Sequence, residues 1–148
     1  MASRLKARDL PGRVITGAYI LHAGLQKWHA DEARDTAVHG LAAGAFPVLN
    51  RIPPARFVRM LAVGEIGTGA ALLTPFVSTG TAGAALTAFS GSLVAMYART
   101  PSMRQPGSIW PSSAGTAVSK DVWMLGIGLG LLVDAAGRRR HRSSGSGA

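Results

Sequence analysis

Five polar side chains lie within or beside two apolar stretches of the chain, and their types are those that hold a proton, an ion pair or a ligand head group. They are His22, Gln26, Lys27, Arg59 and Glu65. Ionisable residues at membrane depth are rare because burying them is costly, so each is a candidate for function. At about 1.5 Å per residue, His22 lies roughly 10 Å and Glu65 roughly 12 Å inward from the outer ends of their expected helices. The matched depths predict one polar cluster.

This cluster has two interpretations at the level of sequence. In the first, the five side chains form a pocket that binds a ligand head group or relays protons. In the second, Glu65 makes a buried ion pair or hydrogen bond with His22, Lys27 or Arg59 and fastens two helices together. The long side chains of Lys27 and Arg59 can reach inward while their stems stay in apolar surroundings. Both interpretations stay open at this point.

Other kinds of site chemistry have little support. The chain contains no cysteine, which excludes disulfides, thiol catalysis and cysteine-ligated metals. The remaining histidines, His29, His39 and His141, fall outside the apolar stretches, which disfavours a bis-histidine haem. The carboxylates lack metal-ligand spacing inside those stretches, so we predict no metal site. We expect no covalent cofactor and no autonomous enzymatic activity.

The composition indicates a membrane protein whose principal partner is the lipid bilayer. Of the 148 residues, 47% are hydrophobic and only 16% are charged, and the formal net charge is +9. Soluble proteins usually have about one quarter charged residues. The basic residues flank apolar runs and are not interleaved with surface aromatic residues, so the charge does not predict nucleic-acid binding.

Four apolar segments approach the roughly 20 residues that a membrane-spanning helix requires. They cover about residues 10–28, 55–76, 81–98 and 120–137. Residues 66–98 carry no charge, and the breakers at 74–75 and 78–80 divide this stretch into a tight hairpin. We therefore expect an all-α protein, a four-transmembrane-helix bundle formed by residues 10–137. A signal peptide is the alternative for the first segment, but no convincing small-residue cleavage site follows it.

The charged flanks predict the orientation of the bundle. Residues 1–9 carry Arg4, Lys6 and Arg8, Arg13 follows shortly after, and the tail 138–148 carries Arg138, Arg139, Arg140 and Arg142. Because basic flanks stay on the cytoplasmic side, we expect a multi-pass protein of a bacterial-type plasma membrane with both termini in the cytoplasm. An aromatic belt then marks the outer ends of the spans, formed by Trp28, Phe57, Tyr97 and Trp123. The Ser/Gly-rich tail is expected to be disordered.

A short helix is expected between the first two spans. Asp31 and Glu32 can begin it, an apolar face follows, and Pro47 ends it. Such a helix would lie on the membrane surface or enter the membrane as a re-entrant segment.

Small residues predict how the spans pack. In the third span, Gly83, Thr87, Gly91 and Ala95 recur every four residues on one face. Helices in lipid associate through such small residues, which let their backbones approach closely. The G-x-G-x-G string at 126–130 lies inside an apolar span with no preceding strand, so it is also interpreted as a packing feature.

Several of these motifs resemble the DoxX family of small membrane proteins. They are Gly17, His22-Ala23-Gly24 and Lys27 in the first span, Gly64-Glu65-Ile66-Gly67-Thr68-Gly69 in the second, and Lys120-Asp121 before Met124-Leu125-Gly126 in the fourth. The resemblance covers about residues 8–136. It implies a four-helix membrane bundle and matches Lys27 and Glu65 to recurring polar positions of the family. The family includes a quinone-linked subunit of a thiosulfate:quinone oxidoreductase among its members.

Two functions follow as hypotheses. The first is a scaffold function, in which the chain is a non-catalytic or quinone-adjacent subunit that docks a redox enzyme or another membrane subunit. Quinone is the candidate cofactor for this function, and a homo-oligomer is a candidate assembly. The second is a small transporter or binding protein for a lipid-like or apolar ligand that uses the intramembrane polar cluster.

Overall fold

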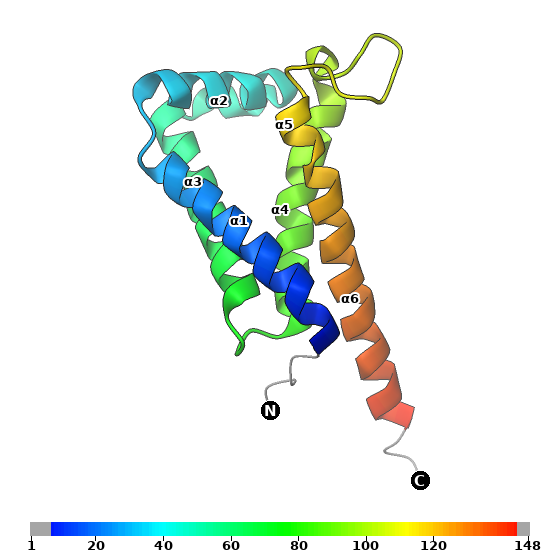
Figure 1. Ribbon diagram of the computed structural model, residues 1–148. Helices are drawn as coiled ribbons and strands as arrows, with labels where there is room; N and C mark the ends of the chain where they lie inside the picture. The colour runs from blue at the N-terminus through cyan, green and yellow to red at the C-terminus, as the bar shows by residue number, and fades with distance from the viewer. Residues whose placement is uncertain (1–6, 145–148) are drawn as a thin grey trace.

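Helices form most of the backbone in the computed structural model, which describes residues 7–144 (Figure 1). The longer elements are α1 (Leu10–Trp28), α2 (Glu32–Ala45), α3 (Pro54–Leu73), α4 (Thr79–Arg99) and α6 (Asp121–Ser144), and a single turn, α5 (Thr116–Ser119), precedes α6. Short 3-10 helices lie at Ala7–Asp9, Pro47–Arg51 and Pro101–Met103. Within the described residues there is no β-strand, so the all-α prediction is confirmed.

Local signals explain where several helices begin. The side chain of Asp31 accepts a hydrogen bond of 2.9 Å from the backbone N–H of Arg34, which caps α2 as the sequence predicts. Pro53 and Pro54 begin α3, because proline is tolerated in a first helical turn. Ser78 caps α4 by accepting from the backbone N–H of Thr81 at 3.1 Å.

The last helix is longer than expected. The tail was predicted to be disordered from residue 138, but α6 continues to Ser144, so this boundary is wrong. Arginine has good helix propensity, and positive charge is favourable at a helix C-terminus, which explains the extension. The predictions for residues 1–6 and 145–148 lie outside the described residues.

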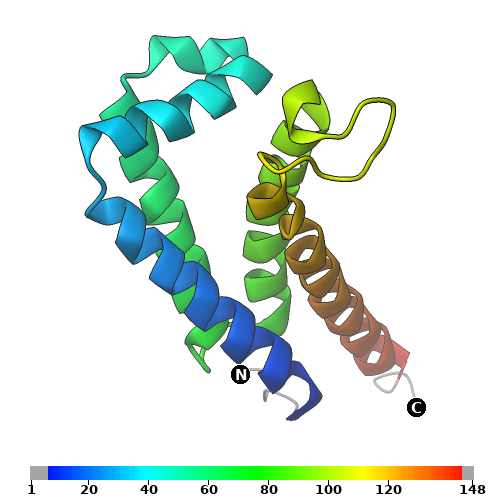
Figure 2. The ribbon, with the colours of Figure 1, turned by 45° about the horizontal axis from the view of Figure 1, so that its top comes forward.

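The four long helices form two pairs with α2 laid across one end. Helix α1 packs along α3, α4 packs along α6, and α2 packs mainly on α3 (Figures 1 and 2). The pairs converge near the two termini and diverge towards α2 (Figure 1). This divergence leaves room for a site between them.

Glycines allow each pair to pack closely. A Cβ atom at Gly69 would lie 2.7 Å from the backbone nitrogen of Leu21 and 2.9 Å from the carbonyl oxygen of Gly17, so α3 contacts the backbone of α1. In the other pair, a Cβ at Gly128 would lie 2.6 Å from Thr87 Oγ1. Backbone contact of this kind is typical of helices that associate in lipid.

The small-residue face of α4 contacts α6 over only part of its length. A Cβ at Gly83 would lie 2.9 Å from Leu131 Cβ, whereas at Gly91 the nearest atom would be Leu125 Cδ1 at 3.8 Å. Ala95, further along, is half-buried. Eight residues of helix rotate the side-chain direction by about 80°, which turns Gly91 away from the line of contact.

We expect Gly83→Leu to lower the free energy of unfolding by about 1–3 kcal/mol through overpacking. Gly91→Leu, its control on the same helix, should change that free energy much less because its position has space. Thermal unfolding in mild detergent measures both. Equal losses for the two variants would contradict this account of the interface.

Arg13 on α1 is fixed against the end of α3 and is not the free basic flank that the sequence indicated. Its side chain is only 1% exposed. The guanidinium donates to the carbonyl oxygens of Leu72, Ala71 and Thr74 at 2.8–2.9 Å, and to that of Val77 at 3.2 Å. The carbonyls of Ala71, Leu72 and Thr74 lie at the end of α3, where the last carbonyl groups of a helix have no backbone N–H partner within the helix. Arg13 therefore caps α3 from α1.

Charged side chains form a second connection at this end. Arg138 on α6 donates to Asp9 at 3.3 Å, just before α1, and contacts Asp134 at 2.7 Å. Arg8 also pairs with Asp134. This network of Arg8, Asp9, Asp134 and Arg138 connects the two helix pairs where they converge.

Two of the described helices are long and apolar enough to cross a membrane. They cover Thr79–Arg99 and Thr116–Arg138, and this criterion does not select α1 or α3. The finding is weak support for membrane association.

Candidate functional site

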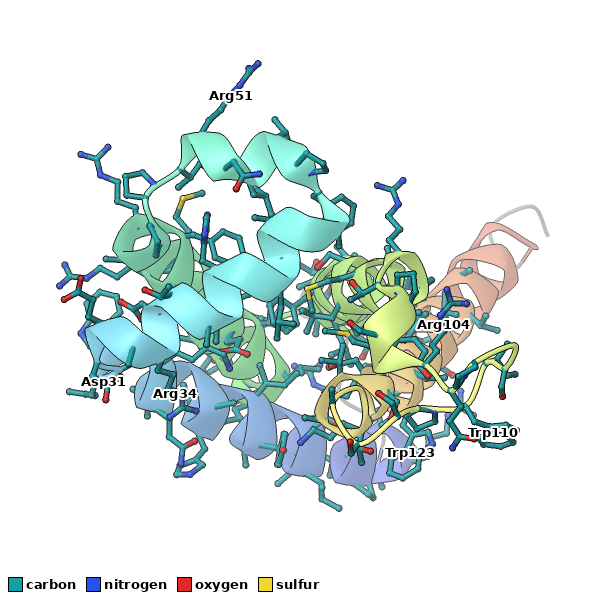
Figure 3. All side chains as sticks on the ribbon, turned by 90° about the horizontal axis from the view of Figure 1, so that it is seen from above. Asp31, Arg34, Arg51, Arg104, Trp110 and Trp123 are labelled. Carbon is teal, nitrogen blue, oxygen red and sulfur yellow. The ribbon has the colours of Figure 1, made fainter. Side chains whose placement is uncertain are left out.

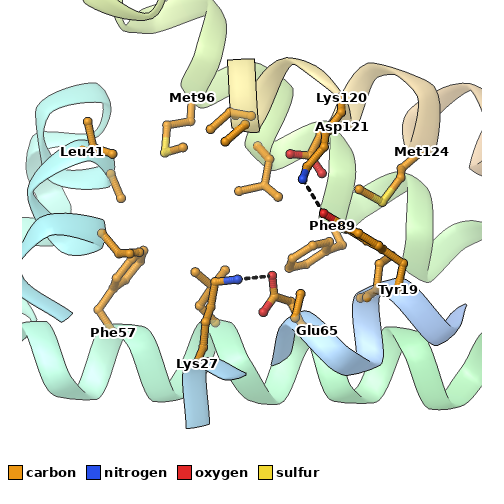
Figure 4. Close-up of a pocket in the computed structure, with 18 of the residues that line it drawn as sticks. Tyr19, Lys27, Leu41, Phe57, Glu65, Phe89, Met96, Lys120, Asp121 and Met124 are labelled. Carbon is orange, nitrogen blue, oxygen red and sulfur yellow. Dashed lines mark hydrogen bonds and ion pairs between the residues drawn. The ribbon is translucent and has the colours of Figure 1, made fainter. Parts of the chain in front are cut away.

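A cavity of about 350 Å³ lies between the two helix pairs, beneath α2 (Figure 4). Its walls come from α1, α2, α3, α4, α5 and α6, and most of its lining side chains are apolar. Figure 4 shows Phe57, Phe89 and Met96 around the open space, with Lys27 and Glu65 on one wall and Asp121 on another. A concave apolar site with a few convergent polar groups is the usual form of a small-molecule pocket.

Lys27 and Glu65 form an ion pair on the cavity wall. Lys27 Nζ donates to Glu65 Oε1 at 2.8 Å, and Glu65 is only 5% exposed. Gly24 makes this pair possible, since a Cβ there would lie 2.9 Å from Glu65 Cβ. The absence of that Cβ lets α1 approach α3 closely, and Lys27, one turn further along, reaches the carboxylate.

Two carboxylates leave acceptor capacity at the cavity. Glu65 Oε2 is buried and has no hydrogen-bond partner among the described residues. Asp121, at the start of α6, is only 6% exposed and lines the cavity, and no ion pair within the described chain reaches it. Buried acceptors normally have partners, so Glu65 Oε2 is an unsatisfied acceptor beside the cavity.

The remaining members of the predicted cluster lie outside the cavity. His22 and Gln26 are exposed and contact each other at 3.0 Å, one turn apart on α1. Arg59 is exposed and lies over the ring of Trp28, with its Cζ 5.9 Å from the ring centroid. The five residues therefore do not form the single cluster that their matched depths predicted. Five residues of helix turn Lys27 about 140° away from His22, so equal depth did not mean the same face.

Asp121 is a buried carboxylate of the cavity that the sequence did not place in the polar cluster. In the sequence it appeared only as part of the Lys120-Asp121 motif at the start of the fourth span. The available signal was a carboxylate directly before an apolar segment. Its position opposite Glu65 depends on how α6 packs against the other pair, which spacing along the chain does not show.

Lys120 and Tyr19 close one side of the cavity. The Lys120 ammonium donates to the Tyr19 hydroxyl and lies 4.8 Å from the centroid of its ring (Figure 4). This contact joins α1 to the residue just before α6 and is a link between the pairs at the diverging end.

Among the described residues, no group of three His, Asp or Glu side chains is placed to hold a metal ion.

Comparison with protein-family models, with curated proteins and with solved structures finds no match for the chain. The resemblance to DoxX proteins therefore stays a prediction from the motifs.

Proposed function

We propose that the chain is an integral membrane protein in which α1, α3, α4 and α6 cross the bilayer. Large apolar side chains support this, because they are exposed on the surfaces of α1, α3 and α6. Examples are Val14 and Ile15 on α1, Met60 and Val63 on α3, and Val133 on α6. Soluble proteins rarely expose extended apolar surface, whereas a lipid-facing helix requires it.

Aromatic side chains support an interface at the α2 end. Trp28 and Trp123 are exposed, and Figure 3 shows Trp123 and Trp110 at the periphery in the view from above. Exposed tryptophan is typical of the level of the lipid head groups. Two other residues of the expected belt have different roles: Tyr97 is buried and donates to the carbonyl of Ile109 at 2.7 Å, and Phe57 packs edge-on against His39.

The orientation can be tested with single cysteines, since the natural chain has none. We expect a membrane-impermeant thiol reagent added outside intact cells to label Thr36→Cys and Gln105→Cys. The same reagent should leave Ser3→Cys and Ser143→Cys unlabelled until the cells are opened. Labelling of either terminal position from outside would overturn the proposed topology.

We infer that the protein binds an apolar or lipid-like small molecule between its helix pairs. The single observation that carries this function is the cavity of about 350 Å³, which has apolar walls and a few buried charged groups. Its size lies at the lower end of the range of ligand pockets, roughly 300–1,000 Å³. The binding function thereby has more support than the scaffold function, which requires no cavity.

Protection from labelling tests this binding. Leu93 lines the cavity, and Val133 is exposed on the outer face of α6. In lipid nanodiscs, decanol should slow the reaction of Leu93→Cys with an apolar maleimide, because the alcohol occupies the same space. The matched control Val133→Cys should react at an unchanged rate. Equal slowing at both positions would mean that decanol acts only through the lipid phase, and the proposal would fail.

The role of a non-catalytic or quinone-adjacent subunit stays a prediction from the DoxX resemblance. A quinone is an apolar molecule with a polar ring, so it belongs to the class of ligands that we propose for this cavity.

A further inference from the structure

We propose that the ligand of this cavity carries an anionic head group on a single alkyl chain, and that Arg34 on α2 binds the head group. This inference deepens the proposed binding function and depends on it. It rests on the balance of charges around the cavity and on the position of Arg34 at the cavity edge.

Cations outnumber carboxylates among the side chains that line the cavity. The basic ones are Lys27, Arg34 and Lys120, and the acidic ones are Glu65 and Asp121. Four of these five charges compensate each other in pairs. Lys27 donates to Glu65 at 2.8 Å, and Figure 4 shows Lys120 beside Asp121, the next residue in the chain. The excess positive charge is therefore that of Arg34.

The Arg34 guanidinium has no anionic partner in the part of the chain that the structure describes. Its backbone N–H donates to Asp31, but none of the ion pairs found there involves its side chain. Two further acidic residues of α2, Glu32 and Asp35, line a separate hollow beside the start of α3. They lie on a different face of α2, so the guanidinium is available to a ligand.

Arg34 lies where the cavity meets its surroundings. Its side chain is exposed, yet it lines the cavity together with Val38 and Leu41 of the same helix. In the view from above, Arg34 lies between α2 and α1 (Figure 3). A head group at this edge can keep part of its hydration, which avoids the cost of burying a charge. The alkyl chain can then extend into the apolar interior.

The guanidinium group determines which head groups fit. Its planar donors match a carboxylate or a phosphate through two parallel hydrogen bonds, and such bonds between ionised groups are stronger than neutral ones. Glu65 does not oppose this, since Oε1 accepts from Lys27 and Oε2 is enclosed by the protein. An ammonium head group would instead meet a like charge at Arg34, and a hydroxyl would add no charge.

The interior of the cavity fits one flexible chain. Met96 and Met124 line it together with Phe89 and Leu93. Methionine is unbranched and adapts to irregular shapes, so these walls accept an alkyl chain without requiring one ring geometry. The volume of about 350 Å³ is small for a ligand pocket, which favours a single chain over the two chains of a diacyl lipid.

Four amphiphiles with the same ten-carbon chain test the proposal: decanoic acid, decyl phosphate, decanol and decylamine. Binding of tritiated decanoic acid to the full chain in nanodiscs of uncharged lipid is measured near pH 8, well above the usual carboxyl pKa of about 4. Empty nanodiscs correct for partition into lipid. We expect decanoic acid or decyl phosphate to compete at a concentration at least roughly fivefold lower than decanol, and decylamine to compete least.

Variants of two exposed arginines assign the effect to Arg34. Arg34→Gln should weaken binding of decanoic acid by roughly fivefold and leave competition by decanol nearly unchanged, whereas Arg34→Lys should keep part of the effect. Arg51→Gln is the matched control, because Arg51 is exposed at the same end of the molecule and points away from the helices (Figure 3). Thermal unfolding verifies that each variant is folded.

The results separate the two proposals. Competition by decanol as strong as by the two anions, tighter binding of decylamine, or equal losses in Arg34→Gln and Arg51→Gln would overturn the anionic head group. Protection of Leu93→Cys by decanol would still support the cavity in each of these cases. Loss of that protection together with absence of decanoic acid binding would overturn both. A preference between decanoic acid and decyl phosphate identifies the head group as a carboxylate or a phosphate.

Discussion

Replacing Gly69 by leucine is expected to separate α1 from α3 and to lower the free energy of unfolding by about 3 kcal/mol, the upper part of the usual range for overpacking. The reason is that a side chain at Gly69 meets backbone as well as side-chain atoms. Its Cβ would lie 2.7 Å from the nitrogen of Leu21 and 2.9 Å from the carbonyl oxygen of Gly17. A side chain can change rotamer to relieve such a contact, but here the helices themselves must move.

Gly67→Leu is the matched control for this prediction. Gly67 is exposed on the same helix, two residues away, and a Cβ there would have no neighbour within 4 Å. Leucine also has a better helix propensity than glycine, so this variant should be at least as stable as the natural protein. Equilibrium unfolding in mixed micelles compares the two variants directly. A similar loss in both would show that α1 and α3 do not contact each other at Gly69.

The second large effect is expected from Glu65→Leu, which leaves Lys27 buried without a partner. Loss of one partner of a buried ion pair typically costs about 3–5 kcal/mol, and we expect the lower end because Lys27 keeps some exposure. Glu65→Gln should cost much less, since its amide oxygen can still accept from Lys27. Unfolding of the two variants under the same conditions measures the difference.

A double variant controls for volume and packing at this position. Lys27→Met combined with Glu65→Leu removes both charges together, so it should recover most of the stability that Glu65→Leu loses. If the double variant is no more stable than Glu65→Leu alone, the loss comes from packing and not from the stranded cation. If Glu65→Gln is as unstable as Glu65→Leu, hydrogen bonding cannot replace the ion pair.

The helices could be predicted from sequence because their signals are local. The segment expected at residues 10–28 is α1, and Asp31 caps α2 as its position before Glu32 indicates. Apolar runs, proline pairs and capping side chains act within a few residues of the helix end that they determine. The end of α6 differs from the expected tail boundary at residue 138, because the helix continues beyond the last apolar residues to Ser144.

The site could be predicted only in part because it depends on the rotation and packing of helices. Matched depth along the helices grouped His22 with Glu65, although His22 lies on another face of α1. Lys27 contacts Glu65, as the reach of its long side chain allowed, and Arg59 does not. Asp121 reaches the cavity through the packing of α6, and Arg13 reaches the end of α3 from the neighbouring α1. Neither contact is visible in the order of residues along the chain.

The most direct test of the central claim, that the cavity between the helix pairs holds an amphiphile, is to locate a heavy atom. The protein can be crystallised from a lipid phase with 10-bromodecanol, and the anomalous signal of bromine gives the position of the chain end. We expect a bromine peak inside the cavity, among Phe89, Leu93 and Met96. Bromine found only on the lipid-facing surfaces, around a cavity that the two helix pairs have closed, would contradict it.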